Sequence, residues 1–419
     1  MTVGQRIVLA LLIVSLFAGL ATGGRLYYRL ALFWGILLIG TWLWSRYSLR
    51  GLRFRRNART LRAQVGQIFE ERFEIQNPGV LPRVWIEVRD ESPLPGVDGS
   101  RVLTMLKGKQ GRSYLARTRL VQRGVFPLGP TILASGDVFG LFPVKNILPV
   151  DESLMVYPMM VDIRTFPNPP GLMPGGEALR RRTHQITPNA SGVREYAPGD
   201  PLNRIHWIST ARRGRLIVKE FELDPLADVW IFLDADRDVQ AHQPYTIQES
   251  LAKDLWQYST QLPLPPSTEE YGVSIAASLV RSYLRRGRAV GLVSAGQIAT
   301  LLSPDRGGRQ LGKMLEALAL VKAEGKLPLQ GLVETQVKHM VRGSTVVLIT
   351  PSVGREIALI VDYLIQRGLL PVAVLMDSES FGGKPGTITL AGYIKALGVP
   401  VRIIANGVDL ETALTEEVF

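Results

Sequence analysis

Two long uncharged stretches stand near the beginning of the chain. Residues Ile7–Gly24 contain no charged side chain, and a second uncharged run extends from Leu30 to Ser45. Each is close to the roughly 20 apolar residues that a membrane-spanning helix requires. Tyrosine and tryptophan, whose rings favour the headgroup region, flank the second run. The pattern predicts a transmembrane helical hairpin over residues 1–50 that contacts the lipid bilayer through residues 7–45.

Residues 60–160 follow a different pattern, in which apolar and polar positions alternate. Val84, Ile86 and Val88 alternate with Trp85, Glu87 and Arg89. This two-residue period is typical of a strand with one buried face. Turn signals rich in glycine and proline recur, and no segment of helical period interrupts them. Short strands so spaced predict an antiparallel β-sandwich.

A proline- and glycine-rich connector occupies residues 161–190, and a third pattern begins at residue 191 and continues to 419. Continuous apolar runs alternate there with amphipathic stretches of helix length, which predicts a doubly wound, Rossmann-type α/β domain with a parallel sheet. The predicted strands are Val229–Leu233, Ala289–Ser294, Thr345–Ile349, Pro371–Met376 and Val399–Ile404.

Helices are predicted between these strands. One runs over Ser267–Arg286 and opens with a capping-box pattern formed by Ser267 and Glu270. Another runs over Gly354–Arg367 and ends at Gly368.

The net charge of +12 is concentrated in the first part of the chain. Residues 1–69 contain ten arginines and no acid, whereas the remaining 350 residues carry 39 basic and 37 acidic groups. The nearly neutral bulk argues against a nucleic-acid partner. Seven arginines follow the second apolar run directly and two lie in the turn between the runs, so the positive-inside rule predicts an inner-membrane protein whose later domains are cytoplasmic.

Cysteine is absent, which excludes disulfides, thiolate zinc sites, iron–sulfur clusters and a cysteine nucleophile. No nucleophile elbow, zinc-protease motif, dinucleotide fingerprint or phosphate-binding loop is present. The four histidines include no pair at helical metal-ligand spacing. The sequence therefore predicts neither an enzyme nor a cofactor.

Three carboxylates follow the first strand of the α/β domain at alternate positions: Asp234, Asp236 and Asp238. Ligands of doubly wound sheets bind beyond the carboxyl ends of the strands, and oxygen-only clusters suit hard divalent cations. A solvated acidic turn is the other interpretation of the same residues.

A second candidate is the segment 192–222. Asp200 suits a helix N-cap and Pro201 the first helical position, so a helix of about three turns is expected to run to Arg213 and stop at Gly214, before a strand. Trp207, with Ile205 or Ile208, is expected to face the fold. Residues 180–219 hold nine basic and two acidic groups, so the segment could dock an acidic partner, although a charge run of this kind is more often a solvated face.

The same segment resembles the bacterial domain-of-unknown-function-58 family. The residues that carry the resemblance are Arg194, Tyr196, Gly199, Asp200, Trp207, Arg212, Gly214, Lys219 and Glu220. Upstream, Asp137–Phe142 resembles a segment of that family's β-sandwich. The resemblance implies a membrane-anchored protein with a von Willebrand factor A-like domain and a partnership with a MoxR-type AAA+ ATPase.

The resemblance also bears on the carboxylates. A von Willebrand A domain binds its cation through Asp-x-Ser-x-Ser, a threonine in a second loop and an aspartate in a third. Asp236 and Asp238 stand where serines are expected, Arg309 stands at the threonine, and Pro351 stands at the last aspartate. We therefore expect no bound metal, and we expect Arg309 to pair with the carboxylates instead.

These observations predict a membrane-anchored scaffold or adaptor that mediates protein–protein interactions. A metal-dependent ligand-binding domain that uses Asp234 is the alternative. A hydrolase ranks third, because no nucleophile and base can be paired.

Overall fold

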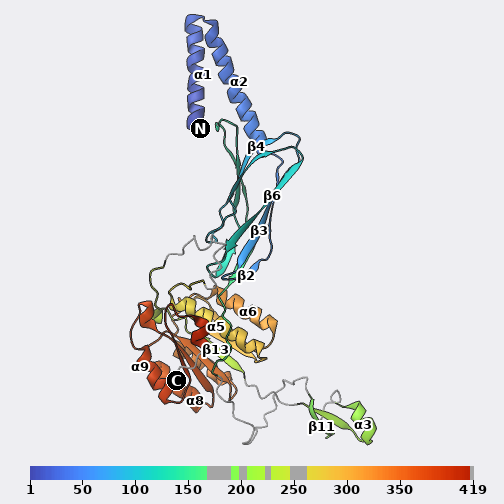
Figure 1. Cartoon of the computed structure of the whole chain (residues 1–419), viewed down its shortest axis with the longest axis vertical. Coiled ribbons are helices and arrows are strands. Elements are labelled where there is room, and N and C mark those ends of the chain that lie inside the picture. Colours follow the sequence, from blue (N-terminus) through green and yellow to red (C-terminus); the bar gives the residue numbers. More distant parts are fainter. Residues whose placement is uncertain (168–189, 198–204, 222–227, 246–261, 416–419) are drawn as a thin grey trace. The chain divides into compact units, whose positions relative to one another are not determined.

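The computed structural model describes residues 1–167, 190–197, 205–221, 228–245 and 262–415. These residues form two compact units (Figure 1). Unit 1 is built mainly from Met1–Met159, and unit 2 is built mainly from Met160–Gln243, Pro266–Met314 and Val321–Phe419. Most of the predicted connector, residues 168–189, lies outside the described residues.

Unit 1 begins with two helices that lie side by side, α1 (Val3–Thr22) and α2 (Arg25–Ser48) (Figure 1). Thr2 and Gln5 form a capping box at the start of α1, and Gly23 ends it in the left-handed conformation at φ 67°. Both helices are long and apolar enough to cross a membrane, as judged by length and composition. The predicted pair of apolar helices is therefore confirmed.

Among the described residues of unit 1, ten strands follow, and all but one of their pairings are antiparallel. They are β1 (Arg53–Ala58), β2 (Arg62–Gln64), β3 (Ile68–Asn77), β4 (Arg83–Asp90), β5 (Arg101–Leu106), β6 (Gln110–Arg119), β7 (Gly124–Pro127), β8 (Thr131–Ser135), β9 (Val144–Leu148) and β10 (Ser153–Tyr157). The strands form three sheets, ordered β1-β3-β6, β2-β10-β7 and β5-β4-β8-β9.

The alternation of apolar and polar residues predicted for β4 agrees with the side chains that form the core of unit 1. Ile86 and Val88 of β4 are fully buried, and they join one hydrophobic cluster with Phe73 and Ile75 of β3. Because β3 and β4 belong to different sheets, the cluster holds the inner faces of two sheets together.

Unit 2 contains a six-stranded mixed sheet in the order β15-β14-β13-β16-β17-β18. Its strands are β13 (Val229–Leu233), β14 (Val290–Ala295), β15 (Ala299–Asp305), β16 (Thr345–Thr350), β17 (Leu370–Met376) and β18 (Val401–Ile404). All five predicted strands are present. The sequence pattern missed β15, an edge strand that pairs antiparallel with β14 and alternates exposed and half-buried positions.

Helices cover both faces of this sheet. They are α5 (Thr268–Arg285), α6 (Gly308–Leu320), α7 (Leu329–Gln336), α8 (Glu356–Gln366), α9 (Thr387–Ala396) and α10 (Leu410–Thr415), with short 3₁₀ turns η2 (Arg237–Val239), η3 (Val337–His339) and η4 (Ser378–Phe381). Residues of α7, α8 and α9 pack with Trp230 and Phe232 on one face. Gly272 of α5 lies against Leu233, which points to the other face.

The capping box predicted for α5 is wrong in its central contact. Ser267 is the N-cap residue, but its side chain makes no capping hydrogen bond. The neighbouring Thr268 accepts a hydrogen bond from the Ala241 backbone N–H at 3.0 Å and donates one to Gln240 Oε1 at 2.7 Å. The start of α5 is thus tied to the loop after β13 rather than to its own first turn.

Candidate functional site

The strand order of unit 2 places two polar residues at one point of the sheet. Counted in chain order from β13, the order is 3-2-1-4-5-6, so the connections reverse direction between β13 and β16. Ligands of doubly wound folds bind at such a switch point, beyond the carboxyl ends of the strands. Asp234 directly follows β13, and Thr350 is the last residue of β16.

The Asp234 carboxylate is buried and held by two hydrogen bonds. The Thr350 hydroxyl donates to Asp234 Oδ2 at 2.6 Å, and the backbone N–H of Asp236 donates to Oδ1 at 3.1 Å. Thr350 Oγ1 in turn accepts from the Ser352 backbone N–H at 2.9 Å. Both oxygens of Asp234 are therefore engaged by groups of the chain itself.

Burial determines the protonation of this group. Asp234 is only 4% exposed, and desolvation raises its pKa from 3.8 to about 6. The hydrogen bonds from Thr350 and Asp236 oppose the rise, whereas the neighbouring carboxylates of Asp236 and Glu356 add to it. A raised carboxylate pKa at a switch point is typical of functional sites, although structural networks also produce it.

The residues around Asp234 do not fit a von Willebrand-type cation. Asp236 is buried, but its Oδ1 accepts the backbone N–H of Asp238 at 3.2 Å. Ser352, in the third loop, donates its hydroxyl to Glu356 Oε1 at 3.2 Å. Within the described part of the chain, no three His, Cys, Asp or Glu side chains are grouped so as to hold a metal ion. We derive no metal-dependent step from this site.

The expected pairing of Arg309 with these carboxylates is wrong. Antiparallel pairing of β15 with β14 aligns Asp305 with Val290, at the amino end of β14, and Arg309 follows four residues later. Asp234 lies at the opposite, carboxyl end of the parallel strands. The loop that contacts the carboxylate turn instead contains Gly325, whose N–H donates to the Ala235 carbonyl at 3.0 Å and whose carbonyl accepts from the Arg237 N–H at 2.9 Å.

The second candidate, which we call the signature hairpin, consists of β11 (Ala190–Glu195), α3 (Trp207–Arg213) and β12 (Ile217–Phe221). The strands pair antiparallel, and Gly214 ends α3 in the left-handed conformation at φ 67°, as predicted. The helix is shorter than predicted. Ile205 bridges to Val218, and the His206 N–H donates to the Ile217 carbonyl, so extended backbone continues to the start of α3.

The residues that carry the family resemblance fall into three groups. Gly199 and Asp200, like Pro201, lie outside the described residues. Arg194, Lys219 and Glu220 lie on the paired strands, and Tyr196 follows β11 with its N–H donating to the Leu216 carbonyl. Trp207, Arg212 and Gly214 belong to α3 and its cap.

The packing of α3 differs from the prediction. Trp207 is 66% exposed and Ile208 is 64% exposed, whereas Ile205 is buried. Arg212, Arg213 and Arg215 are exposed as well, and Arg215 forms an ion pair with Glu195. The hairpin therefore presents an indole, an aliphatic side chain and arginines to solvent.

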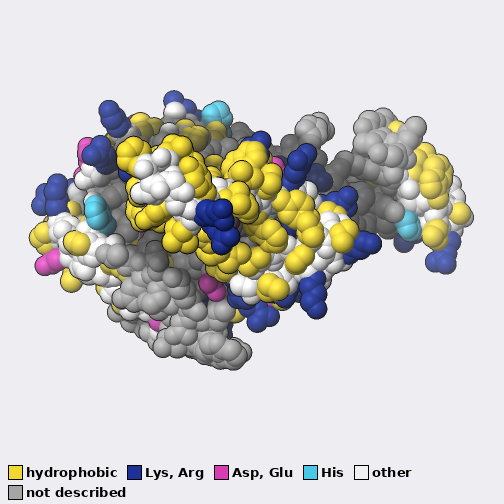
Figure 2. All heavy atoms as spheres, turned by 90° about the horizontal axis from the view of Figure 1, so that it is seen from above, with side chains coloured by type: hydrophobic (Ala, Val, Ile, Leu, Met, Phe, Trp, Pro, Cys, Tyr) yellow, Lys and Arg dark blue, Asp and Glu magenta, His cyan; other side chains and the backbone are white. Residues whose placement is uncertain are grey.

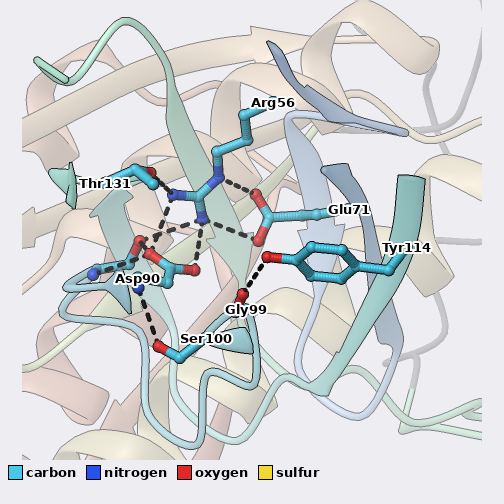
Figure 3. Close-up of polar contacts among 8 residues, drawn as sticks. Arg56, Glu71, Asp90, Gly99, Ser100, Tyr114 and Thr131 are labelled. Atoms are coloured by element: carbon cyan, nitrogen blue, oxygen red, sulfur yellow. Dashed lines mark hydrogen bonds and ion pairs between the residues drawn. The ribbon is translucent and has the colours of Figure 1, made fainter. Parts of the chain in front are cut away.

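Sequence reasoning missed a buried ionic cluster in unit 1, shown in Figure 3. The Arg56 guanidinium donates to Glu71 through Nε (2.7 Å) and Nη2 (2.9 Å), and to both oxygens of Asp90 at 3.0 Å. Arg56 Nη1 also donates to the Thr131 hydroxyl, and the guanidinium lies 5.0 Å from the centre of the Phe73 ring. One signal was available, since Glu71 interrupts an inward row of apolar residues on β3.

Comparisons with known proteins place this chain. A family model described as "Protein of unknown function DUF58" matches residues 192–250. The Uncharacterized protein YeaD of Bacillus subtilis (strain 168) is 25% identical over 310 residues, which cover 73% of this chain and 69% of that protein. The chain is therefore similar to the DUF58 family over residues 192–250. The resemblance predicted from the residues of the signature hairpin is thereby confirmed.

Two solved structures also share local likeness with this chain. Proximal thread matrix protein 1 from the mussel byssus, with a zinc-occupied MIDAS motif, matches at 14% identity over 45% of this chain and 46% of that one, with a TM-score of 0.30. The CARDB domain of a Pyrococcus furiosus protein, in complex with di-metal ions, matches at 12% identity over 25% and 91%, with a TM-score of 0.18. At these scores neither likeness carries an argument.

Proposed function

We propose that this protein is a membrane-anchored scaffold or adaptor that docks an acidic protein partner through its signature hairpin. The observation that carries the proposal is the exposed surface of α3, which has Trp207 and Ile208 in its first turn and Arg212 and Arg213 in its last. Tryptophan and arginine dominate the binding energy of protein interfaces, because they combine large apolar area with directed hydrogen bonds.

The proposed architecture has three parts. Helices α1 and α2 span the inner membrane, and the arginines after α2 keep both units in the cytoplasm. The sheets of unit 1 form a β-sandwich. Unit 2 is a von Willebrand A-like domain, a proposal supported by its 3-2-1-4-5-6 strand order and by Asp234 at the switch point.

A MoxR-type AAA+ ATPase is the proposed partner, because proteins of the resembling family are typically encoded beside one. Exposed arginines at an interface act mainly on association rate and salt dependence, whereas a central tryptophan acts on the lifetime of the complex. The two kinds of residue on α3 can therefore be tested separately.

The test measures binding of the full-length protein to the MoxR-type ATPase encoded beside it. Replacing Arg212, Arg213 and Arg215 with glutamine should slow association and flatten its salt dependence. Trp207→Ala should weaken affinity by roughly 30-fold, equivalent to about 2 kcal/mol. The melting temperature should stay unchanged in both variants, since these side chains are exposed.

The matched control removes the same charge from Lys313, Lys326 and Arg342, which are also exposed in unit 2. Unchanged affinity with a lowered melting temperature in the α3 variants would show that these residues are structural and would end the docking proposal. Topology is tested separately with reporter fusions at the C-terminus, where an active periplasmic reporter would contradict the cytoplasmic orientation.

The alternative function, metal-dependent ligand binding through Asp234, is supported only by the raised pKa and the switch-point position of that carboxylate. It predicts that Mg²⁺ stabilises unit 2. We propose no enzymatic activity.

A further inference from the structure

The loops at one end of the unit 1 sheets are bonded to the ends of the apolar helices. The Thr2 hydroxyl, at the start of α1, donates to the Leu141 carbonyl at 3.0 Å. The Ser45 hydroxyl, in the last turn of α2, donates to the Phe142 carbonyl. The loop that contains both acceptors is therefore held against both helices at once.

Asp137 gives this loop its shape. Its Oδ1 accepts the backbone N–H groups of Phe139 and Leu141 at 2.9 and 3.2 Å, and its Oδ2 accepts that of Phe142. The Asp137 carboxylate is buried, and both of its oxygens accept these backbone hydrogen bonds. A turn of this kind explains why the Asp137–Phe142 motif begins with an acid and continues with apolar residues.

A second loop, Pro78–Pro82, reaches the end of α2 through Arg83. The Arg83 guanidinium donates to the carbonyls of Tyr47 and Arg50 and lies 3.6 Å from the centre of the Tyr47 ring. The Tyr47 carbonyl also accepts the Arg50 N–H at 3.1 Å, and the buried Arg83 of β4 adds side-chain donors at this helix end. Gly79 lies next to the Tyr47 hydroxyl.

The helix lengths place these loops at a membrane boundary. The 20 residues of α1 span about 30 Å, which equals the hydrocarbon thickness of a bilayer. Arg6 ends the uncharged run about one turn from Thr2, so the Thr2–Leu141 contact lies within about one to two helical turns of the hydrocarbon boundary. Helix α2 has 24 residues, so its last turn, which contacts Phe142, extends just past the hydrocarbon.

The loops expose apolar side chains at this level. Val138 and Phe139 are each 66% exposed, Val80 is 77% exposed and Leu81 is 52% exposed. Figure 2, a view onto the end of unit 1 that holds α1 and α2, shows hydrophobic side chains gathered there with lysine and arginine beside them. Aromatic and aliphatic side chains in such a position favour the interfacial region of a bilayer.

The charge around these side chains is positive. Lys109 is bonded to the Gly79 carbonyl through its N–H, and both Lys107 and Lys109 expose their side chains in the adjoining turn. Arg50 is exposed just after α2. Asp137, the only acid in the three loops 78–82, 105–110 and 136–143, is buried. Anionic lipid headgroups match this surface.

We propose that this end of unit 1 is a second membrane contact, in which Phe139, Val138, Val80 and Leu81 enter the interfacial region and Lys107 and Lys109 bind anionic lipid headgroups. The contact rests on the proposed membrane anchoring by α1 and α2. It holds the β-strand unit against the bilayer surface rather than at the end of a free tether.

The absence of cysteine allows a direct test on the full-length protein. Four variants each carry one cysteine, in place of Phe139, Leu81, Ile13 or Ile68, and each cysteine is labelled with an environment-sensitive fluorophore. The labelled proteins are reconstituted in vesicles of phosphatidylcholine with or without phosphatidylglycerol. Spin-labelled lipid then reports contact by quenching. Ile68 is the matched control, because it is an apolar residue, 50% exposed, at the opposite end of β3.

Labels at 139 and 81 should lose about half of their fluorescence to the lipid quencher, and the label at 68 should lose none. Lys107→Gln with Lys109→Gln should abolish the extra quenching at 139 that phosphatidylglycerol produces. A quenched label at 13 with unquenched labels at 139 and 81 would overturn the second contact, leave the anchor intact and favour a protein occupant. An unquenched label at 13 would overturn the anchor and the contact together.

Discussion

Unit 1 and unit 2 each bury carboxylates, and the groups that satisfy them differ. In unit 1, Arg56 lies between Glu71 and Asp90 and donates two hydrogen bonds to each. In unit 2, Asp234 receives its side-chain hydrogen bond from the neutral hydroxyl of Thr350. The two clusters are buried to a similar degree, so the difference between them is one of charge compensation.

This difference indicates what each cluster does. A paired ionic cluster between strands fixes how the strands meet, and the pair as a whole carries little net electrostatic gain. Desolvation still raises the pKa of Glu71, opposed by Arg56. An uncompensated carboxylate weakens the fold at neutral pH, which is a feature that functional sites tolerate and structural cores avoid.

The largest expected effect comes from removing the cation of the unit 1 cluster. Arg56→Met leaves two buried carboxylates without their cation and should destabilise unit 1 by about 3–5 kcal/mol. Arg59→Met is the control, because Arg59 forms an exposed ion pair with Glu70 and should cost under about 1 kcal/mol. Thermal unfolding of the detergent-solubilised protein measures both. Equal losses would show that burial of the cluster is unimportant.

The next effect concerns the pH dependence of unit 2. The folded pKa of Asp234, about 6, lies above 3.8, so its stabilising contribution is complete below pH 3.8 and is lost as pH rises through 6. The loss amounts to about 3 kcal/mol. Asp234→Asn should abolish this dependence, whereas Asp238→Asn, on the same turn but exposed, should keep it.

Hydrogen exchange of peptides from β13 and β16, corrected for intrinsic rates, follows the stability of unit 2 from pH 4 to pH 7. An identical pH slope in the protein and in Asp234→Asn would contradict the buried-carboxylate account of this site.

A smaller effect is expected from the hydroxyl partner. Thr350→Val removes the hydrogen bond that lowers the pKa of Asp234, so the pKa should rise further and the stability of unit 2 at pH 7 should fall by about 1–2 kcal/mol. Thr350→Ser keeps the donor and serves as the control. The same hydrogen-exchange measurement tests this variant. If the pH at which unit 2 loses stability moved to lower values in Thr350→Val, Thr350 could not be the group that lowers the pKa of Asp234.

The smallest expected effect is that of a divalent cation. Mg²⁺ at millimolar concentration should leave the exchange of β13 and β16 unchanged, because Arg309 and Pro351 stand in the sequence where a von Willebrand-type site would need two oxygen ligands. A site whose dissociation constant for Mg²⁺ is one hundredth of the added Mg²⁺ concentration would stabilise unit 2 by about 2.7 kcal/mol. Protection of that size, lost in Asp234→Asn, would favour the metal-dependent alternative.

Local patterns in the sequence were sufficient for the apolar elements. The runs that predicted β13, β14, β16, β17 and β18 contain apolar residues at nearly every position, because both faces of those strands are covered by helices. The edge strand β15 is half-exposed and carries Ser303, Pro304 and Asp305, so its composition resembles a loop. The existence of α1 and α2 was likewise predicted from uncharged runs, but their ends were not, since α1 begins four residues before Ile7 and α2 begins five residues before Leu30.

Contacts between distant residues required the tertiary structure. The sequence by itself determined the order of apolar helices, alternating strands and buried strands, because burial imposes a period on the residues of each element. Only the fold decided that Arg56 meets Asp90, that Asp234 meets Thr350 and that Arg309 lies at the far end of the sheet. These outcomes depend on strand direction and register, which bring together residues 34 and 116 positions apart and leave no local pattern.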